Sequence, residues 1–306
     1  MRRVDGVLSR TRRAPATKHR SEMRSATEVK RAAVITHGKP ETIGAALERL
    51  QALSAERGVE LLFPDEEIEK HRLGSDYGDL ADADVAVADV AVVLGGDGTM
   101  LRALRRFLGT SVPVIGVNFG RVGFLASLEA DSLEDGLGRA FAGDYRVVEL
   151  PALDAEAGGE RWAAVNDVVV TSSSLGRMIE LGWAIGGEDL GLLPCDGLIC
   201  CTPSGSTAYN LSNGGPVLVW GLDAMAITFV APHSLHARPL VVPRGRDLAV
   251  ANRTADVSAT VLVDGHRVRE LAPGEEVRID LSAQRSLLAT LPESTFFSRY
   301  RRTFAS

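Results

Sequence analysis

Residues 92–102, VVLGGDGTMLR, decide how the first half of this chain folds. The run before the glycines, residues 90–94, is apolar without a break and rich in valine, as expected of a strand buried on both faces of a parallel sheet. Apolar residues then recur at helical spacing over residues 100–108. The stretch predicts a strand, a glycine turn and a helix, with Asp97 in the turn. Because open α/β sheets bind ligands at this end of their strands, Asp97 is a candidate functional residue.

The pattern of predicted elements changes near residue 150. Before it, strand-like RAAVITH, VELLFP and VPVIGVNFG alternate with helical stretches such as ETIGAALERLQALSAERG. After it, runs such as LICCTP, AMAITFVAP and EEVRIDLS are strand-like and few helices separate them. We therefore expect an α/β domain with a parallel sheet and flanking helices at residues 31–150, and a β-rich, sandwich-like domain at 151–286. In residues 287–306 the aromatic residues Phe296, Phe297, Tyr300 and Phe304 have helical spacing, which predicts a helix that docks on another surface.

Charge and composition exclude several classes of protein. The chain has 306 residues and a net charge of -6, but residues 1–30 hold nine Lys or Arg against three acids, which leaves -12 for the rest. We expect those first residues to be a disordered basic extension, although a start codon placed too far upstream explains them equally well. The acidic remainder argues against a nucleic-acid partner. Since no stretch approaches the ~18 apolar residues of a membrane span, we expect no membrane partner.

Cysteine and histidine give little sign of a metal site. Cys195, Cys200 and Cys201 fit neither a disulfide framework nor a zinc site, so we expect buried thiols in a reducing cytoplasm. His233 and His236 have no third ligand nearby, which favours structural roles over zinc. Residues 264–265, Asp-Gly, suit a two-residue hairpin turn, although hairpin tips can also reach a ligand.

The glycine turn suits phosphate without matching the commonest phosphate motifs. Neither GxxxxGK[ST] nor GxGxxG after a strand occurs in the chain. Glycines at positions 95, 96 and 98 nevertheless let the backbone approach a ligand at a helix start. Asp97 has two interpretations, a helix N-cap or a carboxylate that takes a proton or holds a metal in phosphoryl transfer. Arg102, one turn further, either neutralises phosphate charge or is a solvated arginine.

Two further groups of polar residues lie in the β-rich half. In VNDVVV, Asn166 and Asp167 interrupt a valine strand, where they need backbone partners or a ligand. Arg177 opens a strand with apolar same-parity positions, which points it either to a buried partner or to water. In CDGLICCTPSGSTAYNLSNGGP, residues 195–216, Asp196 opens a buried strand and a hydroxyl-rich turn follows it. That run favours a binding turn over a capped helix with a core tyrosine.

These blocks together resemble the NAD kinase family. GGDGTML is similar to its GGDGT signature, GVNFGRVGFL to its NxGxxGFL segment, VNDVVV to its NE/D motif, and TPSGSTAYNLSNGGP to its TPTGSTAYxxSxGGP block. PHSLHARPLVVP also resembles a family segment. The likeness runs from about residue 31 to near the C-terminus, and its long fourth block is the most specific. It implies an α/β domain, a β-rich domain and a C-terminal segment that returns to the first.

The resemblance also implies an activity and a set of site residues. Asp97 would be the general base that takes a proton from the adenosine ribose 2′-hydroxyl of NAD, whose oxygen attacks the γ-phosphorus of ATP. Gly95 and Gly96 would let the triphosphate and Mg2+ approach. Asp196 would join Asn166 and Asp167 at the adenine and ribose, and Arg177 would contact the charged part of NAD. The residues implied in NAD binding are Asp97, Gly98, Arg102, Asn166, Asp167, Arg177, Asp196, Thr207, Ala208, Tyr209, Asn210, Leu211 and Ser212.

Three departures from the family pattern and two alternatives remain. Ser204 replaces the usual threonine, Asp167 the commoner glutamate, and His266 a frequent glutamine. The alternatives are a diacylglycerol-type lipid kinase of the same superfamily, which would lack the second and third blocks, and a non-catalytic dinucleotide sensor, which would lack Asp97. The sequence leaves open the donor, ATP or polyphosphate, the use of NADH, and regulation by NADP or NADPH. The resemblance implies a homodimer or homotetramer, with a neighbouring subunit completing the pocket.

Overall fold

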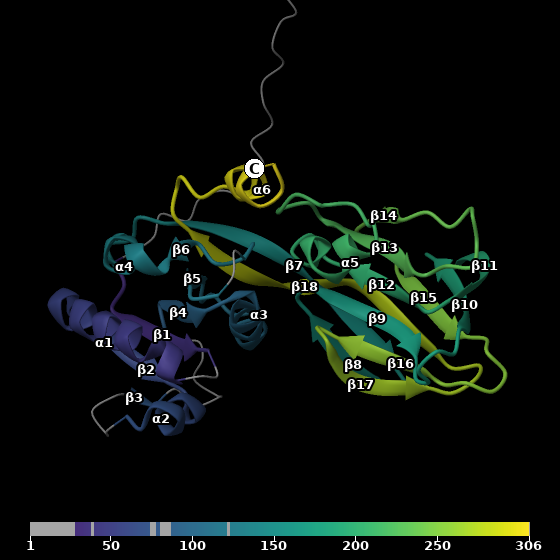
Figure 1. The fold of residues 1–306 in the computed structure, drawn as a ribbon, viewed down its shortest axis with the longest axis horizontal. Helices are drawn as coiled ribbons and strands as arrows, with labels where there is room; N and C mark the ends of the chain where they lie inside the picture. Colours follow the sequence, from purple (N-terminus) through teal and green to yellow (C-terminus); the bar gives the residue numbers. More distant parts are fainter. Residues whose placement is uncertain (1–27, 38–39, 74–77, 80–86, 121–122, 306) are drawn as a thin grey trace, which may run out of the picture.

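The computed structural model describes residues 28–37, 40–73, 78–79, 87–120 and 123–305. The first 27 residues, which hold most of the predicted basic extension, lie outside the described residues. The described chain forms two lobes side by side, a helix-containing one built from residues early in the chain and a strand-rich one built from later residues (Figure 1).

The first lobe alternates strands and helices, as the sequence predicts. Its parallel strands lie in the order β5-β4-β1-β2-β3, and β6 pairs with β5. The elements are β1 (Arg31–Thr36), α1 (Pro40–Arg57), β2 (Glu60–Phe63), α2 (Asp65–His71), β3 (Gly78–Asp79), β4 (Val90–Gly95), α3 (Asp97–Arg106), β5 (Val114–Asn118), β6 (Leu128–Glu129), the 3-10 turn Ala130–Ser132 and α4 (Leu133–Phe141).

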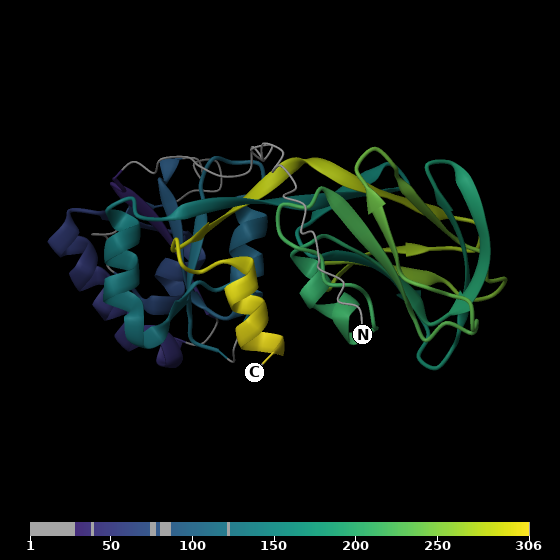
Figure 2. The same cartoon turned by 90° about the horizontal axis from the view of Figure 1, so that it is seen from above.

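Helices cover both faces of this sheet. Successive residues of β4 face opposite sides, so Val92 packs with α1 and α4 whereas Val93 packs with α3. All six residues of β4 are buried, which confirms the prediction from its unbroken apolar run. Figure 2 shows the same layers, with α1 and α4 on one face and α3 and the C-terminal helix α6 (Phe296–Phe304) on the other.

The second lobe is a β-sandwich, which confirms the predicted fold class. One layer is a six-stranded sheet in the order β14-β13-β12-β9-β16-β17, and the other is the far part of the sheet that continues from the first lobe. Its elements are β7 (Arg146–Ala157), β8 (Glu160–Ala164), β9 (Asp167–Ser172), β10 (Ile179–Ile185), β11 (Glu188–Cys195), β12 (Gly197–Cys201), the 3-10 turn Gly205–Thr207, α5 (Tyr209–Ser212), β13 (Ala224–Val230), β14 (Leu240–Pro243), β15 (Leu248–Asn252), β16 (Ala259–Val263), β17 (His266–Leu271) and β18 (Glu276–Thr290).

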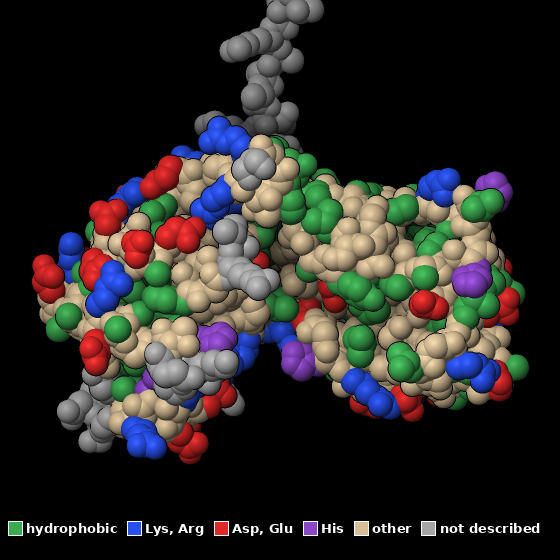
Figure 3. Space-filling view, viewed as in Figure 1, with side chains coloured by type: hydrophobic (Ala, Val, Ile, Leu, Met, Phe, Trp, Pro, Cys, Tyr) green, Lys and Arg blue, Asp and Glu red, His purple; other side chains and the backbone are tan. Residues whose placement is uncertain are grey.

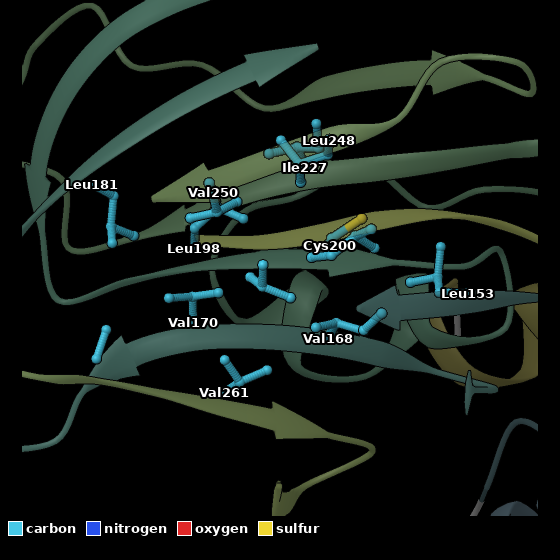
Figure 4. Packing of buried hydrophobic residues seen from close by; sticks show 14 of the residues in the cluster. Leu153, Val168, Val170, Leu181, Leu198, Cys200, Ile227, Leu248, Val250 and Val261 are labelled. Carbon is cyan, nitrogen blue, oxygen red and sulfur yellow. The ribbon is translucent and has the colours of Figure 1, made fainter. Parts of the chain in front are cut away.

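The sandwich core lies between these two layers. Val168 and Leu198 of the six-stranded sheet face Leu181 and Val250 of the other layer, and all four side chains are buried (Figure 4). Side chains that alternate inward in this way give a sandwich core about 10 Å thick.

Two long strands connect the lobes. β18 pairs with β15 in the sandwich and, near its other end, with β5 of the parallel sheet, where Leu288 lies opposite Val114. β7 runs antiparallel to β18 over most of its length. The lobes therefore share a continuous sheet of paired strands.

One sequence expectation is wrong in detail, and the predicted docking of the C-terminal helix is confirmed with only part of its aromatic stripe. Asn166 and Asp167 do not lie inside one strand, because β8 ends at Ala164 and β9 begins at Asp167. The C-terminal helix does not bury its whole aromatic stripe, since Phe296 is 8% exposed but Phe297 is 67% exposed. The docking face of α6 consists of the buried Phe296 and Arg299 together with Phe304, whose ring centroid lies 6.0 Å from that of Phe124.

Candidate active site

Asp97 is the first residue of α3 and stands at the carboxyl end of β4. Its carboxylate accepts two backbone N–H groups from another segment, that of Phe124 at 2.7 Å and that of Leu125 at 3.1 Å. The N-cap position belongs to Gly96. The helix-cap interpretation of Asp97 is therefore wrong in this structure, because its oxygens are directed at the loop after β5. Each carboxylate oxygen has two acceptor sites, so capacity for a further donor remains.

The glycines around Asp97 have different roles. A Cβ on Gly123 would lie 2.2 Å from Oδ1 of Asp97, so Gly123 provides the space that the carboxylate occupies. A Cβ on Gly95 would lie 2.5 Å from the Thr99 hydroxyl, which makes this glycine a packing requirement of α3. A Cβ on Gly98 meets no described atom within 4 Å, and on Gly96 it meets only Gly120 at 3.9 Å. Gly96 and Gly98 thus face open space where a ligand can approach.

Arg102 lies in a polar cluster beside the end of β1. Its Nη2 donates to the Thr36 carbonyl at 2.7 Å and to Glu67 at 3.2 Å. Glu67, on α2, is fully buried and also accepts from the Thr36 hydroxyl and from Lys70. The Arg102 side chain remains 49% exposed. Arg102 is therefore neither a freely solvated arginine nor an unpaired one, because Glu67 fixes it beside the strand ends.

Asp264 organises the start of β9. Its carboxylate accepts the backbone N–H groups of Val165, Asn166 and Asp167 at 3.0, 2.7 and 3.1 Å. Asp264 lies in the β16–β17 hairpin turn with φ +47, a conformation that Asp tolerates better than most residues. These bonds satisfy the backbone N–H groups between the end of β8 and the start of β9 and account for the break in the predicted strand.

Asp167 and Asn166 are both candidates for ligand contact. Asp167 is 7% exposed, and burial together with the nearby charge of Asp264 raises the pKa of its carboxyl to about 7. The Asn166 side-chain oxygen Oδ1 is buried and has no hydrogen-bond partner among the described residues. A buried acceptor of this kind is uncommon in a folded protein, and a ligand donor would satisfy it.

The TPSGST segment, residues 202–207, packs directly on the backbone of Val165 and Asn166. The hydroxyls of Thr202 and Ser204 both donate to the Val165 carbonyl, at 2.6 and 2.8 Å. The hydroxyl of Ser204 is therefore used, as expected for a mild replacement of threonine. A Cβ on Gly205 would lie 2.1 Å from the Asn166 carbonyl oxygen, so the two segments touch through their backbones.

The residues that follow form the turn predicted to bind. Tyr209 is 46% exposed and Ser212 is also exposed, which excludes the core-tyrosine alternative. Thr207, Ala208 and Leu211 are half-buried. Asn210, by contrast, is fully buried; its amide nitrogen donates to the carbonyls of residues 206 and 216, and its amide oxygen accepts from the hydroxyl of Thr228. Its side chain holds the turn together from inside.

Arg177 and Asp196 lie at the other end of the six-stranded sheet. Asp167 is opposite Cys201 on β12, whereas Asp196 precedes Gly197, which is opposite Thr171. Five residues of strand correspond to about 17 Å. Arg177 is exposed and forms a salt bridge with Asp256 at 2.9 Å. Its side chain therefore lies at the surface, and the alternative of a buried partner is wrong. One chain does not bring these two residues next to Asn166 and Asp167.

The two lobes meet between Asp97 and the Asn166 region. On α3, Arg105 contacts Asp264 at 3.6 Å and His266 at 3.2 Å, both in the β16–β17 hairpin. The loop that holds Asp97 also touches the second lobe, because the rings of Phe124 and Trp220 are 5.5 Å apart. Figure 3 shows the surface hollowed between the lobes, with Arg, Lys and His side chains at its edge.

No metal site is built from side chains alone in the described part of the chain, which contains no group of three or more His, Cys, Asp or Glu suited to a metal ion. The three cysteines are free and buried, as predicted. Among the described residues no helix is both long enough and apolar enough to cross a membrane.

Sequence reasoning missed the supporting roles of Asp264, Glu67 and Arg299. The sequence predicts Asp264 in a hairpin turn or at a tip that reaches a ligand, and nothing local shows that it accepts from three amides about 100 positions earlier. Arg299 did leave a signal, because it lies three residues after Phe296 and so shares the docking face of its helix. Glu67, in an acidic helix start, left none.

Comparison with protein families gives two matches that together span most of the chain. Residues 34–145 match the ATP-NAD kinase N-terminal domain, and residues 165–291 match the ATP-NAD kinase C-terminal domain. A curated NAD kinase of Gemmatimonas aurantiaca is 38% identical over 219 residues, which are 70% of this chain and 76% of that protein. The NAD kinase of Symbiobacterium thermophilum is 36% identical over 283 residues, 89% of this chain and 98% of that protein.

Solved structures with the same fold include two kinases. Yeast NADH kinase, complexed with NADH, superposes with a TM-score of 0.79 at 22% identity and covers 91% of this chain and 88% of its own. An NAD kinase from Archaeoglobus fulgidus, in complex with ATP, superposes with a TM-score of 0.66 at 28% identity and covers 90% of this chain and 97% of its own.

Proposed function

Since this chain belongs to the NAD kinase family and acts as an NAD kinase, we propose that Asp97 is the general base of its reaction. The 2′-oxygen of the adenosine ribose of NAD forms a bond to the γ-phosphorus of ATP, the bond from that phosphorus to the β,γ-bridging oxygen breaks, and ADP leaves. The 2′-hydroxyl proton passes to the Asp97 carboxylate, and the product is NADP. Such assistance typically contributes about 100- to 10,000-fold to a rate.

One observation carries this proposal: the Asp97 carboxylate is fixed by the Phe124 and Leu125 amides instead of capping its own helix. A base held by two donors has a defined direction, and proton transfer depends on such geometry. Its position at the carboxyl end of β4 is where α/β sheets bind ligands.

The adenosine half of NAD is proposed to bind across Asn166, Asp167 and the turn at residues 207–212. The unpaired Oδ1 of Asn166 suits an amino or hydroxyl donor. The exposed ring of Tyr209 suits stacking on a base, with Ser212 beside it. Asn210 acts by holding this turn, and Leu211 contributes apolar wall.

The phosphate donor is proposed to approach Gly96 and Gly98, where the start of α3 presents backbone N–H groups. We expect Mg2+ to arrive with the phosphates of ATP and to use few protein ligands, as is usual for this ion. The metal supplies stabilisation of charge on the transferring phosphoryl group. Arg102, fixed by Glu67, adds positive charge at the same edge.

We also propose a homo-oligomer located in the cytoplasm. Asp196 lies about 17 Å along the strands from Asp167, and Arg177 lies in the loop after the far end of β9, so both suit the NAD bound by a second copy. Apolar side chains on the surface of the β-rich lobe, including the fully exposed Leu175, support an interface there. The buried free thiols suit a reducing compartment.

The test is NADP formation by purified protein with NAD, Mg2+ and either ATP or polyphosphate. We expect Asp97→Asn to lower kcat by about 100-fold or more while the Kd of NAD, measured by calorimetry, changes little. Asp135→Asn is the matched control, because Asp135 is an exposed acid in the first turn of α4. Unchanged turnover in Asp97→Asn would reject the base assignment. A wild-type protein that binds NAD but forms no NADP would instead be a non-catalytic dinucleotide sensor.

A further inference from the structure

Arg299 of α6 is a buried cation that the reaction as proposed does not use. It is 1% exposed. Its Nη1 donates to the carbonyls of Phe124, Leu125 and Ala126 at 2.9, 3.0 and 2.6 Å, and its Nη2 donates to the Ser127 hydroxyl at 2.9 Å. One guanidinium thus binds four consecutive residues of the loop after β5.

The same loop holds Asp97. The Phe124 carbonyl and the Leu125 N–H belong to one peptide unit, so Arg299 binds one side of this unit and Asp97 binds the other, at 3.1 Å. Hydrogen bonds in such a chain polarise one another. Arg299 therefore fixes the orientation of a peptide dipole that is directed at the Asp97 carboxylate.

Arg299 is costly as a purely structural residue. Among the described residues it forms no salt bridge, and its Nε has no hydrogen-bond acceptor. Burial, together with the nearby charge of Arg302, lowers the pKa of its guanidinium to about 10, and the charges of Asp97 and Glu129 oppose that shift. A buried charge without a close counter-ion usually lowers stability relative to an apolar residue. The acidic groups whose charge acts on Arg299 are Asp97, on the other side of the Phe124–Leu125 peptide, and Glu129.

Arg299 also contacts the second lobe. Its guanidinium lies over the Trp220 ring, 5.1 Å from the ring centroid. Trp220 is two residues after Leu218, whose N–H donates to the Ser206 hydroxyl of the TPSGST segment. The C-terminal helix thus links the loop that holds Asp97 to the segment that precedes the NAD-binding turn.

We propose that Arg299 is a positioning residue for Asp97: it holds the Phe124–Leu125 peptide so that the Leu125 N–H, next to that of Phe124, fixes the carboxylate toward the ribose 2′-hydroxyl. This inference rests on the proposed role of Asp97. Without Arg299, the loop carbonyls lose their donors and the peptide loses its fixed orientation. The carboxylate is then misplaced, which slows proton transfer more than it weakens NAD binding.

The experiment compares Arg299→Met, which keeps the length of the side chain, with Arg301→Met, an exposed arginine on the same helix. We expect Arg299→Met to lower kcat by about 10- to 100-fold, with KM for NAD changed less than about threefold. Arg301→Met should match the wild type. Both are assayed well below their melting temperatures. Arg299→Lys retains a charge and some of the donors, so its kcat should be intermediate, and it serves if Arg299→Met does not fold.

A double-mutant cycle with Asp97→Asn separates positioning from general stability. If Arg299 acts through Asp97, Arg299→Met has little further effect on residual turnover once the base is gone. Losses that multiply would overturn the inference, as would an unchanged kcat in Arg299→Met. A failure of the proposed function has a different result, because Asp97→Asn alone would then retain turnover.

Discussion

The substitution Gly123→Ala tests whether the position of Asp97 limits the reaction. The added Cβ would lie 2.2 Å from Oδ1 and 2.7 Å from Cγ of Asp97, whereas ordinary contacts of a Cβ are 3.4–4 Å. The carboxylate, or the loop that holds it, must therefore move by about 1 Å. A misplacement of that size costs about 100-fold in rate, equivalent to about 2.7 kcal/mol in the activation free energy.

The assay is steady-state NADP formation with NAD and ATP varied separately. We expect the loss in kcat, with KM for NAD nearly unchanged, because Asp97 is the one predicted NAD contact that the added Cβ displaces. Gly44→Ala on α1 is the control, since a Cβ there meets no described atom within 4 Å. A folded Gly123→Ala protein whose kcat stays within about threefold of wild type would refute the reasoning, because its carboxylate would then tolerate the displacement.

Three further variants test the NAD-binding side. The raised pKa of Asp167, about 7, means that the folded state keeps a proton that the unfolded state releases near pH 4. The stability contributed by this group therefore falls as pH rises from about 4 to 7. Asp167→Asn should raise the melting temperature at pH 8 but not at pH 4. An equal shift at both pH values would contradict this. Asp264→Ala leaves three N–H groups without their acceptor and should lower the free energy of unfolding by about 3 kcal/mol or more in denaturant titrations. Asp264→Asn, which keeps one oxygen, is its milder control, and equal losses would count against the capping role. Gly205→Ala, whose Cβ would lie 2.1 Å from the Asn166 carbonyl oxygen, should raise KM for NAD more than it lowers kcat; the reverse split would count against the proposed pocket.

The fold could be predicted largely from local patterns. The unbroken apolar run before Gly95 predicts the central strand, because a strand buried on both faces is apolar at every position. The helical spacing of apolar residues after it predicts α3, because a helix that buries one face is apolar only every three or four residues. The change to strand-like runs after residue 150 gives the sandwich. What failed was the strand through Asn166, because three long-range bonds from Asp264 override its local valine pattern.

The site could be predicted in its parts but not in its assembly. Glycines and Asp97 at a strand end indicate a ligand site, but their spacing does not show that the carboxylate turns toward Phe124. The separation of Asp196 from Asp167 follows only from the antiparallel pairing of β9 and β12. Arg299 illustrates the same limit, since its partners are more than 170 positions away in the sequence.

The most direct test of the account is the distance from the Asp97 carboxylate to the ribose 2′-oxygen in a structure of the protein with NAD bound. The account predicts about 2.6–3.2 Å for the closer carboxylate oxygen, with the Phe124 and Leu125 amides still in place. A 2′-oxygen more than about 5 Å away, with no bridging water and the carboxylate bonded only to those amides, would contradict it.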